Sequence, residues 1–207
     1  MPNSGLPTLE DVANDAGVST ATVSRCINLP GQVKAHTREK VLRVIEKLGY
    51  TPNFSAKALA SNKTGTIGAI IPTMDNAIFA KGLQAFQEKL AANGITLLVS
   101  SSNYSQDQEV KNVKSLVSRG VDGLMLIGTE RSPEIYELLH KRNIPYVIAW
   151  SYHENLKHNC VGFNNEKAAF ELAKYVLQYG HRKIAMISGI ALGNDRAADR
   201  IKGVEQA

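Results

Sequence analysis

The spacing of hydrophobic positions changes once along the chain, near residue 65. Before that point apolar residues recur three and four positions apart, as in Leu9, Val12, Ala13 and Ala16, which is the period of a helix with one buried face. After it, short apolar runs alternate with amphipathic stretches of about helix length. The pattern predicts a small helical head followed by an α/β body.

Local signals divide the head into helices. Thr8 and Asp11 are spaced as in a capping box at the start of a first helix. Gly17 can take the positive φ that ends this helix, and Ser19 can cap a second one. Two short helices joined by a tight turn are therefore expected.

A third helix is predicted to begin after a Thr37 cap and to end at Gly49. Its apolar positions are expected to close a very small core, and they are Val41, Leu42, Ile45 and Leu48.

The second helix has an outward face that fits a nucleic acid. Val23 and Ile27 are expected to face inward, which leaves small and polar side chains outside: Thr20, Ala21, Ser24 and Arg25. A helix that enters the major groove needs slim residues near the bases and gains from an arginine that can pair with guanine or phosphate. A solvated helical hairpin would show the same pattern, so the residues alone leave both interpretations open.

The alternation of apolar runs and amphipathic stretches in the body predicts a mainly parallel sheet that is covered on both faces. Six apolar runs read as strands, at 66–72, 95–100, 122–128, 145–150, 160–163 and 183–189. Ser132 followed by Pro133 is typical of a helix start between two of them.

Ligands of open parallel sheets bind at the carboxyl ends of the strands. Aromatic, amide and guanidinium groups follow the predicted strands there, which suits a polyhydroxylated or anionic small molecule. These candidates are Asn76, Phe79, Trp150, Asn194, Arg196 and Arg200.

Charge and composition narrow the class of protein. The 207 residues carry a net charge of +5, and residues 1–63 hold eight Lys/Arg against five Asp/Glu, which is compatible with phosphate contact. We find no signal peptide and no apolar segment of membrane-spanning length. Cys26 and Cys160 have no metal-like or disulfide-like spacing. A soluble cytoplasmic protein is expected.

No enzyme motif stands out. Nucleotide-binding glycine loops, a nucleophile elbow and paired catalytic acids are all missing from the sequence. His153, His158 and Cys160 lie close together in the sequence, but a zinc site needs about four ligands and no fourth is at useful spacing. We expect neither a metal nor a cofactor, and no catalytic activity.

The head resembles the lactose/galactose repressor family of bacterial transcriptional regulators. The resemblance is carried by DVA (11–13), AGVS (16–19), TVSR (22–25), TREKV (37–41) and LGYTPN (48–53). It implies a helix-turn-helix DNA-binding head at 1–50, a hinge at 51–64 and a recognition helix at 20–27. The DNA-contacting residues that it implies are Thr8, Ser19, Thr20, Ala21, Thr22, Ser24, Arg25, Asn28, Asn53, Ala56 and Leu59.

Residues 52–65 are too few to form a stable helix alone. The resemblance implies that they fold on a palindromic operator bound by a homodimer, where Leu59 beside Ala56 wedges into the minor groove. An ordinary linker leucine is the alternative.

The body is similar to the periplasmic-binding-protein fold that forms the effector domain of the same family. The resemblance implies that Asn76, Ile78 and Phe79 line one lip of a cleft and that Arg200 contacts the effector, a sugar or sugar acid. Trp150 departs from the aspartate found in many members, which changes the expected specificity.

The resemblance also implies two effector-binding subdomains, the first at 65–158 and the second starting at 159–207. Because the chain stops at Ala207, inside the helix after the sixth predicted strand, we expect both to be incomplete. A sugar-binding protein without a regulatory role, or a non-functional fragment of a regulator, remain the alternatives.

Overall fold

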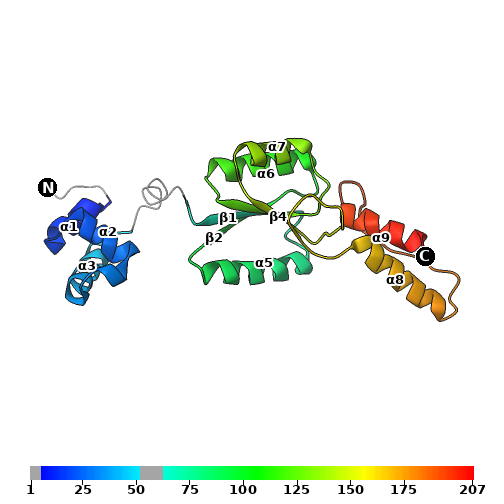
Figure 1. Ribbon diagram of the computed structural model, residues 1–207, viewed down its shortest axis with the longest axis horizontal. Coiled ribbons are helices and arrows are strands. Elements are labelled where there is room, and N and C mark those ends of the chain that lie inside the picture. Colours follow the sequence, from blue (N-terminus) through cyan, green and yellow to red (C-terminus); the bar gives the residue numbers. More distant parts are fainter. Residues whose placement is uncertain (1–5, 52–62) are drawn as a thin grey trace. The chain divides into compact units, whose positions relative to one another are not determined.

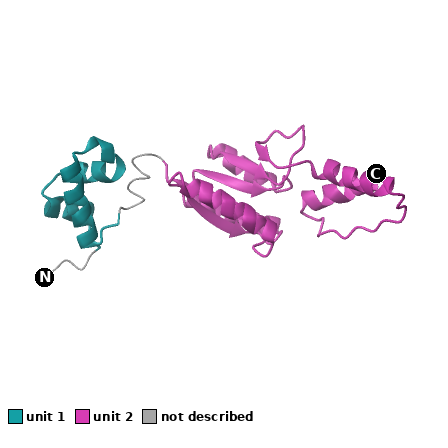
Figure 2. Ribbon diagram, turned by 90° about the horizontal axis from the view of Figure 1, so that it is seen from below, with its two compact units in different colours: residues 1–57 teal, residues 58–207 magenta. Residues whose placement is uncertain are grey.

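The computed structural model describes residues 6–51 and 63–207. The chain divides into two compact units, residues 1–57 and residues 58–207 (Figure 2). We call them the head and the α/β unit.

The head consists of α1 (Leu9–Ala16), α2 (Thr20–Asn28), a 3₁₀ turn (Pro30–Gln32) and α3 (Ala35–Leu48). The predicted signals between the first two helices are confirmed. Thr8 and Asp11 form a capping box, Gly17 ends α1 with φ 60°, and the Ser19 side chain accepts a hydrogen bond from the Thr22 backbone N–H.

The start predicted for α3 was wrong by three residues. The helix begins at Ala35 after an extended Lys34, and Thr37 lies inside its first turn. Ala35 and His36 carry no helix-breaking side chain, so the helix continues toward its N-terminus past the hydroxyl that was expected to cap it.

The head core differs from the prediction at one position. Val41 and Val44 are the buried residues of α3, whereas Leu42 is 46% exposed. Val41, Val44, Ile45 and Leu48 follow the 3,4 spacing of one face, and Leu42 lies a third of a turn away from it. Five other side chains complete the buried core, and they are Val12, Ala13, Ala16, Val23 and Cys26.

The α/β unit is built on one parallel sheet in the order β2-β1-β3-β4-β5. Its strands are β1 (Thr66–Ile71), β2 (Thr96–Ser101), β3 (Gly123–Ile127), β4 (Tyr146–Ala149) and β5 (Cys160–Val161). All four pairings are parallel, which confirms the first four predicted strands and their direction. The short β5 pairs with β4, so the sheet extends past residue 158.

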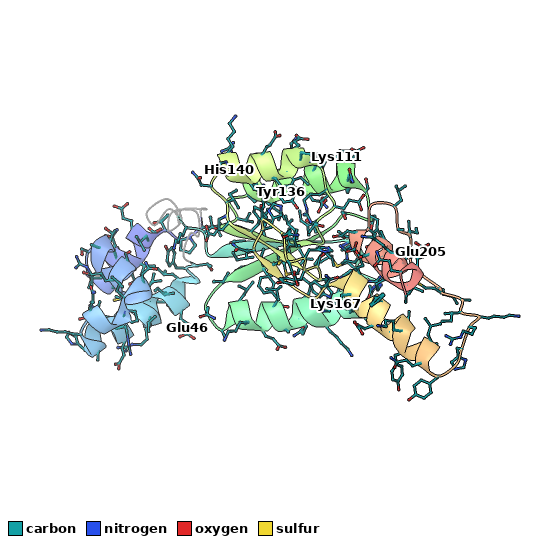
Figure 3. All side chains as sticks on the ribbon, turned by 45° about the vertical axis from the view of Figure 1, so that its right-hand side comes forward. Glu46, Lys111, Tyr136, His140, Lys167 and Glu205 are labelled. Atoms are coloured by element: carbon teal, nitrogen blue, oxygen red, sulfur yellow. The ribbon has the colours of Figure 1, made fainter. Side chains whose placement is uncertain are left out.

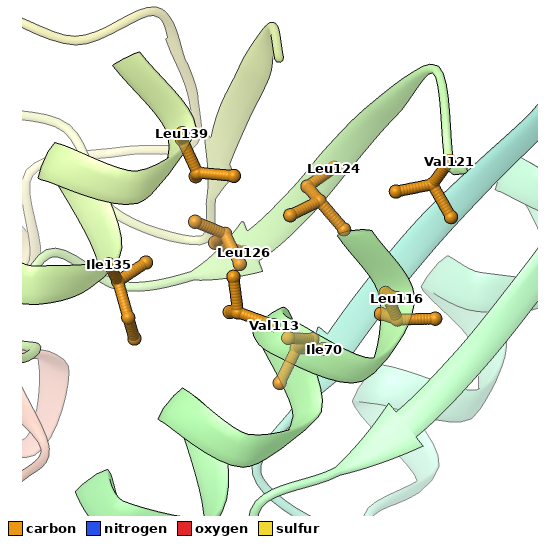
Figure 4. Close-up of a cluster of buried hydrophobic side chains, with 8 residues drawn as sticks. All are labelled: Ile70, Val113, Leu116, Val121, Leu124, Leu126, Ile135 and Leu139. Carbon is orange, nitrogen blue, oxygen red and sulfur yellow. The ribbon is translucent and has the colours of Figure 1, made fainter. Parts of the chain in front are cut away.

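Helices cover both faces of this sheet. α6 (Gln106–Ser118) and α7 (Pro133–Lys141) lie on one face and α5 (Ala77–Ala91) on the other (Figure 1). The cluster between the sheet and the first two of these helices joins eight buried aliphatic side chains (Figure 4). A second cluster, which includes Met125, Ile127 and Phe79, packs toward α5.

The strand predicted at 183–189 was wrong. These residues have no regular structure, and residues 181–190 are exposed. A strand needs a neighbour to satisfy its backbone groups, and in the part of the chain that the structure describes no strand lies beside this segment. The segment instead connects α8 (Asn165–Gln178) to α9 (Asp195–Glu205).

Helices α8 and α9 pack closely on each other (Figure 1). Gly203 makes this possible, because a Cβ at that position would meet the backbone of Glu166 and Phe170 on α8.

Candidate DNA-binding and effector sites

The outward face of α2 carries short side chains and one arginine. Thr20, Ala21 and Arg25 are exposed, as predicted from their spacing. Among residues 6–51 and 63–207 no hydrogen-bond or ion-pair partner occupies the Arg25 guanidinium. Its five N–H donors are therefore available to an external acceptor.

The polar residues around this face hold one another in place. Ser19 Oγ and Thr22 Oγ1 lie 2.9 Å apart. The Asn28 side-chain N–H group donates to the backbone oxygen of Ser24 at 3.0 Å. These hydroxyls and this amide thus sit at both ends of α2 with fixed orientations.

Thr8 is committed to the capping box. Its backbone N–H and its hydroxyl both donate to Asp11 Oδ2, at 2.8 and 2.7 Å. These hydrogen bonds lower the pKa of the exposed Asp11 carboxyl. The other three predicted DNA contacts, Asn53, Ala56 and Leu59, lie outside the described residues.

In the α/β unit, the residues predicted after the first and fourth strands come together in part. Asn76 caps α5 by accepting a hydrogen bond from Ile78 N–H at 2.9 Å, and Ile78 is 63% exposed. Phe79 is buried and meets Trp150 edge to face, with ring centroids 5.6 Å apart. The Trp150 indole also lies where a Cβ at Gly82 would be, so it packs against α5.

The start of α9 docks on the loop that follows β3. Asp195 Oδ2 accepts hydrogen bonds from Thr129 N–H at 2.6 Å and from the Thr129 hydroxyl at 2.7 Å. Asp195 also pairs with Arg196 at 2.8 Å. Asn194, predicted as a ligand contact, caps this helix and is buried.

Gly128 permits this docking. It has φ 75°, and a Cβ there would collide with the Arg196 and Asp195 side chains. We call the contacts of Gly128 and Thr129 with Asp195 and Arg196 the α9 latch.

A buried ion pair lies behind the latch. Arg131 Nη1 is 2.9 Å from Glu109 Oε1, and the Arg131 side chain has no exposed surface. Arg131 also donates to the backbone oxygens of Ile127 and Gly128 at the end of β3. Burial raises the pKa of Glu109, and the neighbouring Arg131 limits that rise. Burial likewise lowers the pKa of Arg196, which Asp195 counteracts.

A small polar cavity of about 20 Å³ opens between these groups and the ends of β1 and β3. Those two strands are neighbours from which the connections run in opposite directions, and ligands of open α/β sheets bind at such a switch point. The volume holds about one water. The polar lining comes from Ser102, Tyr104, Ser105, Gln106, Glu109, Glu130 and Arg196.

Arg200 lies one turn along α9 from Arg196. Its Nη1 donates to Asn165 Oδ1 at 2.7 Å. Asn165 in turn donates to the backbone oxygen of Trp150. The predicted Arg200 and the carboxyl end of β4 are therefore linked through one amide.

The histidines near Cys160 serve separate contacts. His153 Nε2 lies 3.1 Å from Asp199 Oδ2. His158 Nδ1 lies 2.7 Å from the Tyr146 hydroxyl, and its ring stacks on that of Tyr136. Tyr136 lies on α7 (Figure 3). Within the described ranges no three His, Cys, Asp or Glu side chains gather around a possible metal position. No helix of that part is long and apolar enough to cross a membrane.

The sequence analysis missed several residues of the candidate effector site at the carboxyl ends of the strands, which we call the effector region. Thr129 and Arg131 lie in the segment 129–132, which the rule for strand ends selects from the sequence, but neither residue was named as a contact. Ser102 and Tyr104 follow the second strand, whose end was not considered. Glu109 and Asn165 lie near helix starts and gave no local signal, because their partners are distant in sequence.

Comparisons with known proteins place both units. Residues 8–53 match "Bacterial regulatory proteins, lacI family", and residues 67–207 match "Periplasmic binding protein domain". Catabolite control protein A of Priestia megaterium is 36% identical over 97% of this chain and 60% of its own length. The HTH-type transcriptional regulator GntR of Escherichia coli K12 is 30% identical, with the same coverage. The chain thus spans about 60% of the length of these curated relatives.

Solved structures agree. A LacI-family transcriptional regulator from Silicibacter pomeroyi superposes with a TM-score of 0.84 at 30% identity, over 97% of this chain and 60% of that one. The lac repressor dimer bound to operator and the anti-inducer ONPF gives a TM-score of 0.82 at 26% identity, over 98% and 61%. The chain therefore belongs to the lacI family of bacterial regulatory proteins and joins that family's helical head to a periplasmic-binding-protein domain.

Proposed function

We propose that this chain is a sequence-specific DNA-binding transcriptional regulator, most simply a repressor, in which α2 enters the major groove. One observation carries the proposal: α2 presents the slim Thr20 and Ala21 beside an unoccupied Arg25. Short side chains let the helix approach the base edges, and a free guanidinium can pair with a guanine. Two of the relatives named above, GntR and the Silicibacter pomeroyi protein, are transcriptional regulators and support this assignment.

The target is a palindromic operator bound by a homodimer. A dimer places two copies of α2 in successive major grooves, and the symmetry of the protein requires symmetry of the site. Leu59, with Ala56 three positions before it in the sequence, is the proposed minor-groove wedge between the two half-sites. Support comes from the lac repressor structure, which is a dimer on its operator.

The effector is a sugar or sugar acid bound at the carboxyl edge of the sheet. Arg196 and Arg200 supply donors for hydroxyl or anionic groups, and the cavity beside Arg196 has a polar lining. Opening or closing of the α9 latch is the proposed link to DNA affinity, since a ligand that favours one state shifts the population toward it. Acting on DNA, the protein works in the bacterial cytoplasm.

The first test is selection of the purified chain against a randomised duplex library at physiological salt. Enrichment of an inverted repeat with a fixed centre is expected from a dimeric regulator. A pool that stays random, both for the full chain and for residues 1–63 fused to a dimeric scaffold, would refute the DNA-binding assignment.

The enriched duplex then tests Arg25. Arg25→Ala is expected to weaken binding to that duplex by about 1 to 3 kcal/mol and to have less effect on random DNA, because the arginine contacts a base. Arg43→Ala, which removes another exposed arginine of the head, is the matched charge control. If Arg25→Ala weakens binding to the enriched duplex and to random DNA equally, Arg25 contacts only a phosphate.

A further inference from the structure

Asn165 is a buried amide that links α9 to the end of β4. It is the first residue of α8, and only 1% of it is exposed. Its Oδ1 accepts from Arg200 Nη1 at 2.7 Å, while its Nδ2 donates to the backbone oxygens of Trp150 and Phe163 at 3.1 and 3.4 Å. Three segments that are distant in sequence thus meet at one side chain.

These contacts fix the orientation of the amide. An asparagine side chain offers two N–H donors and one oxygen with two lone pairs. Here both donors face carbonyl oxygens and the oxygen faces a guanidinium. A flipped amide would set its NH₂ against the guanidinium and its oxygen against a carbonyl, so only one orientation is compatible with the surroundings.

The backbone at the other end of this link is held in a sparsely populated conformation. Trp150 has φ 62°, which costs a bulky residue free energy that the surroundings must supply. Its N–H donates to Val161 O at 2.9 Å, and its carbonyl points at Asn165. The amide is one of the groups that stabilise this turn.

Arg200 is held without being neutralised. No carboxylate forms an ion pair with it among the described residues, and its partner there is the neutral Asn165. Arg200 also lies close enough to Arg196 to lower the pKa of that residue. A second cation nearby and a neutral holder leave the remaining N–H donors and the full positive charge for an incoming anion.

We propose that Asn165 is a positioning residue of the effector site, which fixes the Arg200 guanidinium relative to the end of β4 so that its free donors receive an anionic group. The inference rests on the proposed function in that it takes Arg200 as the ligand contact. Asn165 itself touches no ligand and acts through Arg200.

The test measures the ordering of Arg200 in the full chain without any effector. Phenylglyoxal modification of Arg200 is quantified by peptide mass spectrometry relative to the exposed Arg182. Asn165→Ala is expected to raise the relative rate at Arg200 by about five-fold or more, because a hydrogen bond to a charged group is lost. Asn165→Asp keeps an acceptor for Arg200, so its rate is expected at or below that of the unmodified protein.

Asn164→Ala is the matched control for helix stability. Asn164 caps the same helix by accepting from Lys167 N–H at 2.9 Å, so its loss destabilises α8 without touching Arg200. In Asn164→Ala the relative rate of modification of Arg200 is expected to stay within about two-fold of the rate in the unmodified protein, although the melting temperature falls. Equal acceleration in Asn164→Ala and Asn165→Ala, or none in Asn165→Ala, would reduce Asn165 to a structural residue. If Asn165→Ala does not fold, Asn165→Ser is scored in the same way.

A second arm separates this inference from the proposed function. Inorganic phosphate, gluconate and glucose 6-phosphate are added as probes to the unmodified chain, and protection of Arg200 from modification is measured. Protection that Asn165→Ala abolishes supports both statements. An absence of protection by all three, with the ligand-free rates as expected, counts against Arg200 as an anion contact and leaves its positioning by Asn165 established.

Discussion

The head and the α/β unit assemble their candidate sites over different ranges of sequence. In the head, the contacts that orient the polar residues join positions three or four apart, as between Thr8 and Asp11 or Ser24 and Asn28. In the α/β unit, Thr129 meets Asp195 across 66 positions, and Asn165 meets Arg200 across 35.

This difference has a consequence for how each site fails. Local contacts form whenever their helix forms, so the face of α2 depends only on α2 being held as a helix by the small head core. The effector region depends on several elements docking at once, so a single change in packing can displace a residue that it does not touch. The head should tolerate substitution better than the α9 latch.

The largest expected effect comes from two ion pairs of similar length. Arg131–Glu109 is 2.9 Å long and buried, whereas Lys47–Asp15 on the head is 3.0 Å long and exposed. Glu109→Leu leaves Arg131 buried without an anion and is expected to destabilise the α/β unit by about 3 to 5 kcal/mol. Lys47→Ala is expected to cost about 0 to 1 kcal/mol. Denaturant unfolding of each variant provides the comparison, and similar costs for the two would show that burial does not separate them.

A second prediction concerns two glycines of positive φ. Gly128 and Gly180 have φ 75° and 86°, but only at Gly128 would a Cβ meet other atoms, those of Arg196 and Asp195. Gly180→Ala is expected to cost about 1 kcal/mol for the left-handed backbone alone. Gly128→Ala adds an overlap with the latch and is expected to cost about 1 to 3 kcal/mol more. Urea unfolding measures the difference between the two variants. Equal losses of stability would show that the α9 latch accommodates the added Cβ without cost.

The smallest expected effect is a dependence of stability on pH. Its sign is opposite in the head and in the α/β unit. Hydrogen bonds from Thr8 lower the pKa of Asp11, so its contribution to stability is present above the unfolded pKa and is lost as the pH falls through the folded value. Burial raises the pKa of Glu109, so its contribution is present at low pH and is lost as the pH rises through the raised value.

Amide exchange of head and α/β peptides between pH 3 and 6 checks both signs, with Asp11→Asn as the control for the head. In that variant, head protection is expected to vary less across the acid range. An unchanged profile would assign the head's acid sensitivity to other groups.

The same contrast explains what could be predicted from the sequence. The caps at Thr8 and Ser19, the glycine that ends α1 and the outward face of α2 follow from neighbours in the chain, and the structure has them. The cap predicted at Thr37 was wrong, because the helix starts earlier, at Ala35. The first four strands were also readable, since each is a continuous apolar run between turn signals. Leu42 was misplaced because two overlapping helical faces share most of their apolar residues.

The remaining features depend on partners that no local pattern shows. The apolar run at 183–189 has strand composition, but a strand exists only where another one pairs with it. Glu109 and Asn165 look like ordinary polar residues at helix starts until folding brings Arg131 and Arg200 to them. The cavity beside Arg196 likewise needs three separate strand ends.

Trp150 is the only tryptophan among the 207 residues. It directly follows β4, its ring contacts Phe79, and its backbone oxygen accepts a hydrogen bond from Asn165, which in turn binds Arg200. Its emission therefore comes from a single place at the edge of the effector region. The tryptophan fluorescence of the protein therefore reports on this site without a label. No second tryptophan contributes to the signal when a quencher is added or the sample is heated. Ligand titrations and rapid-mixing experiments on the unmodified chain can follow that one signal directly.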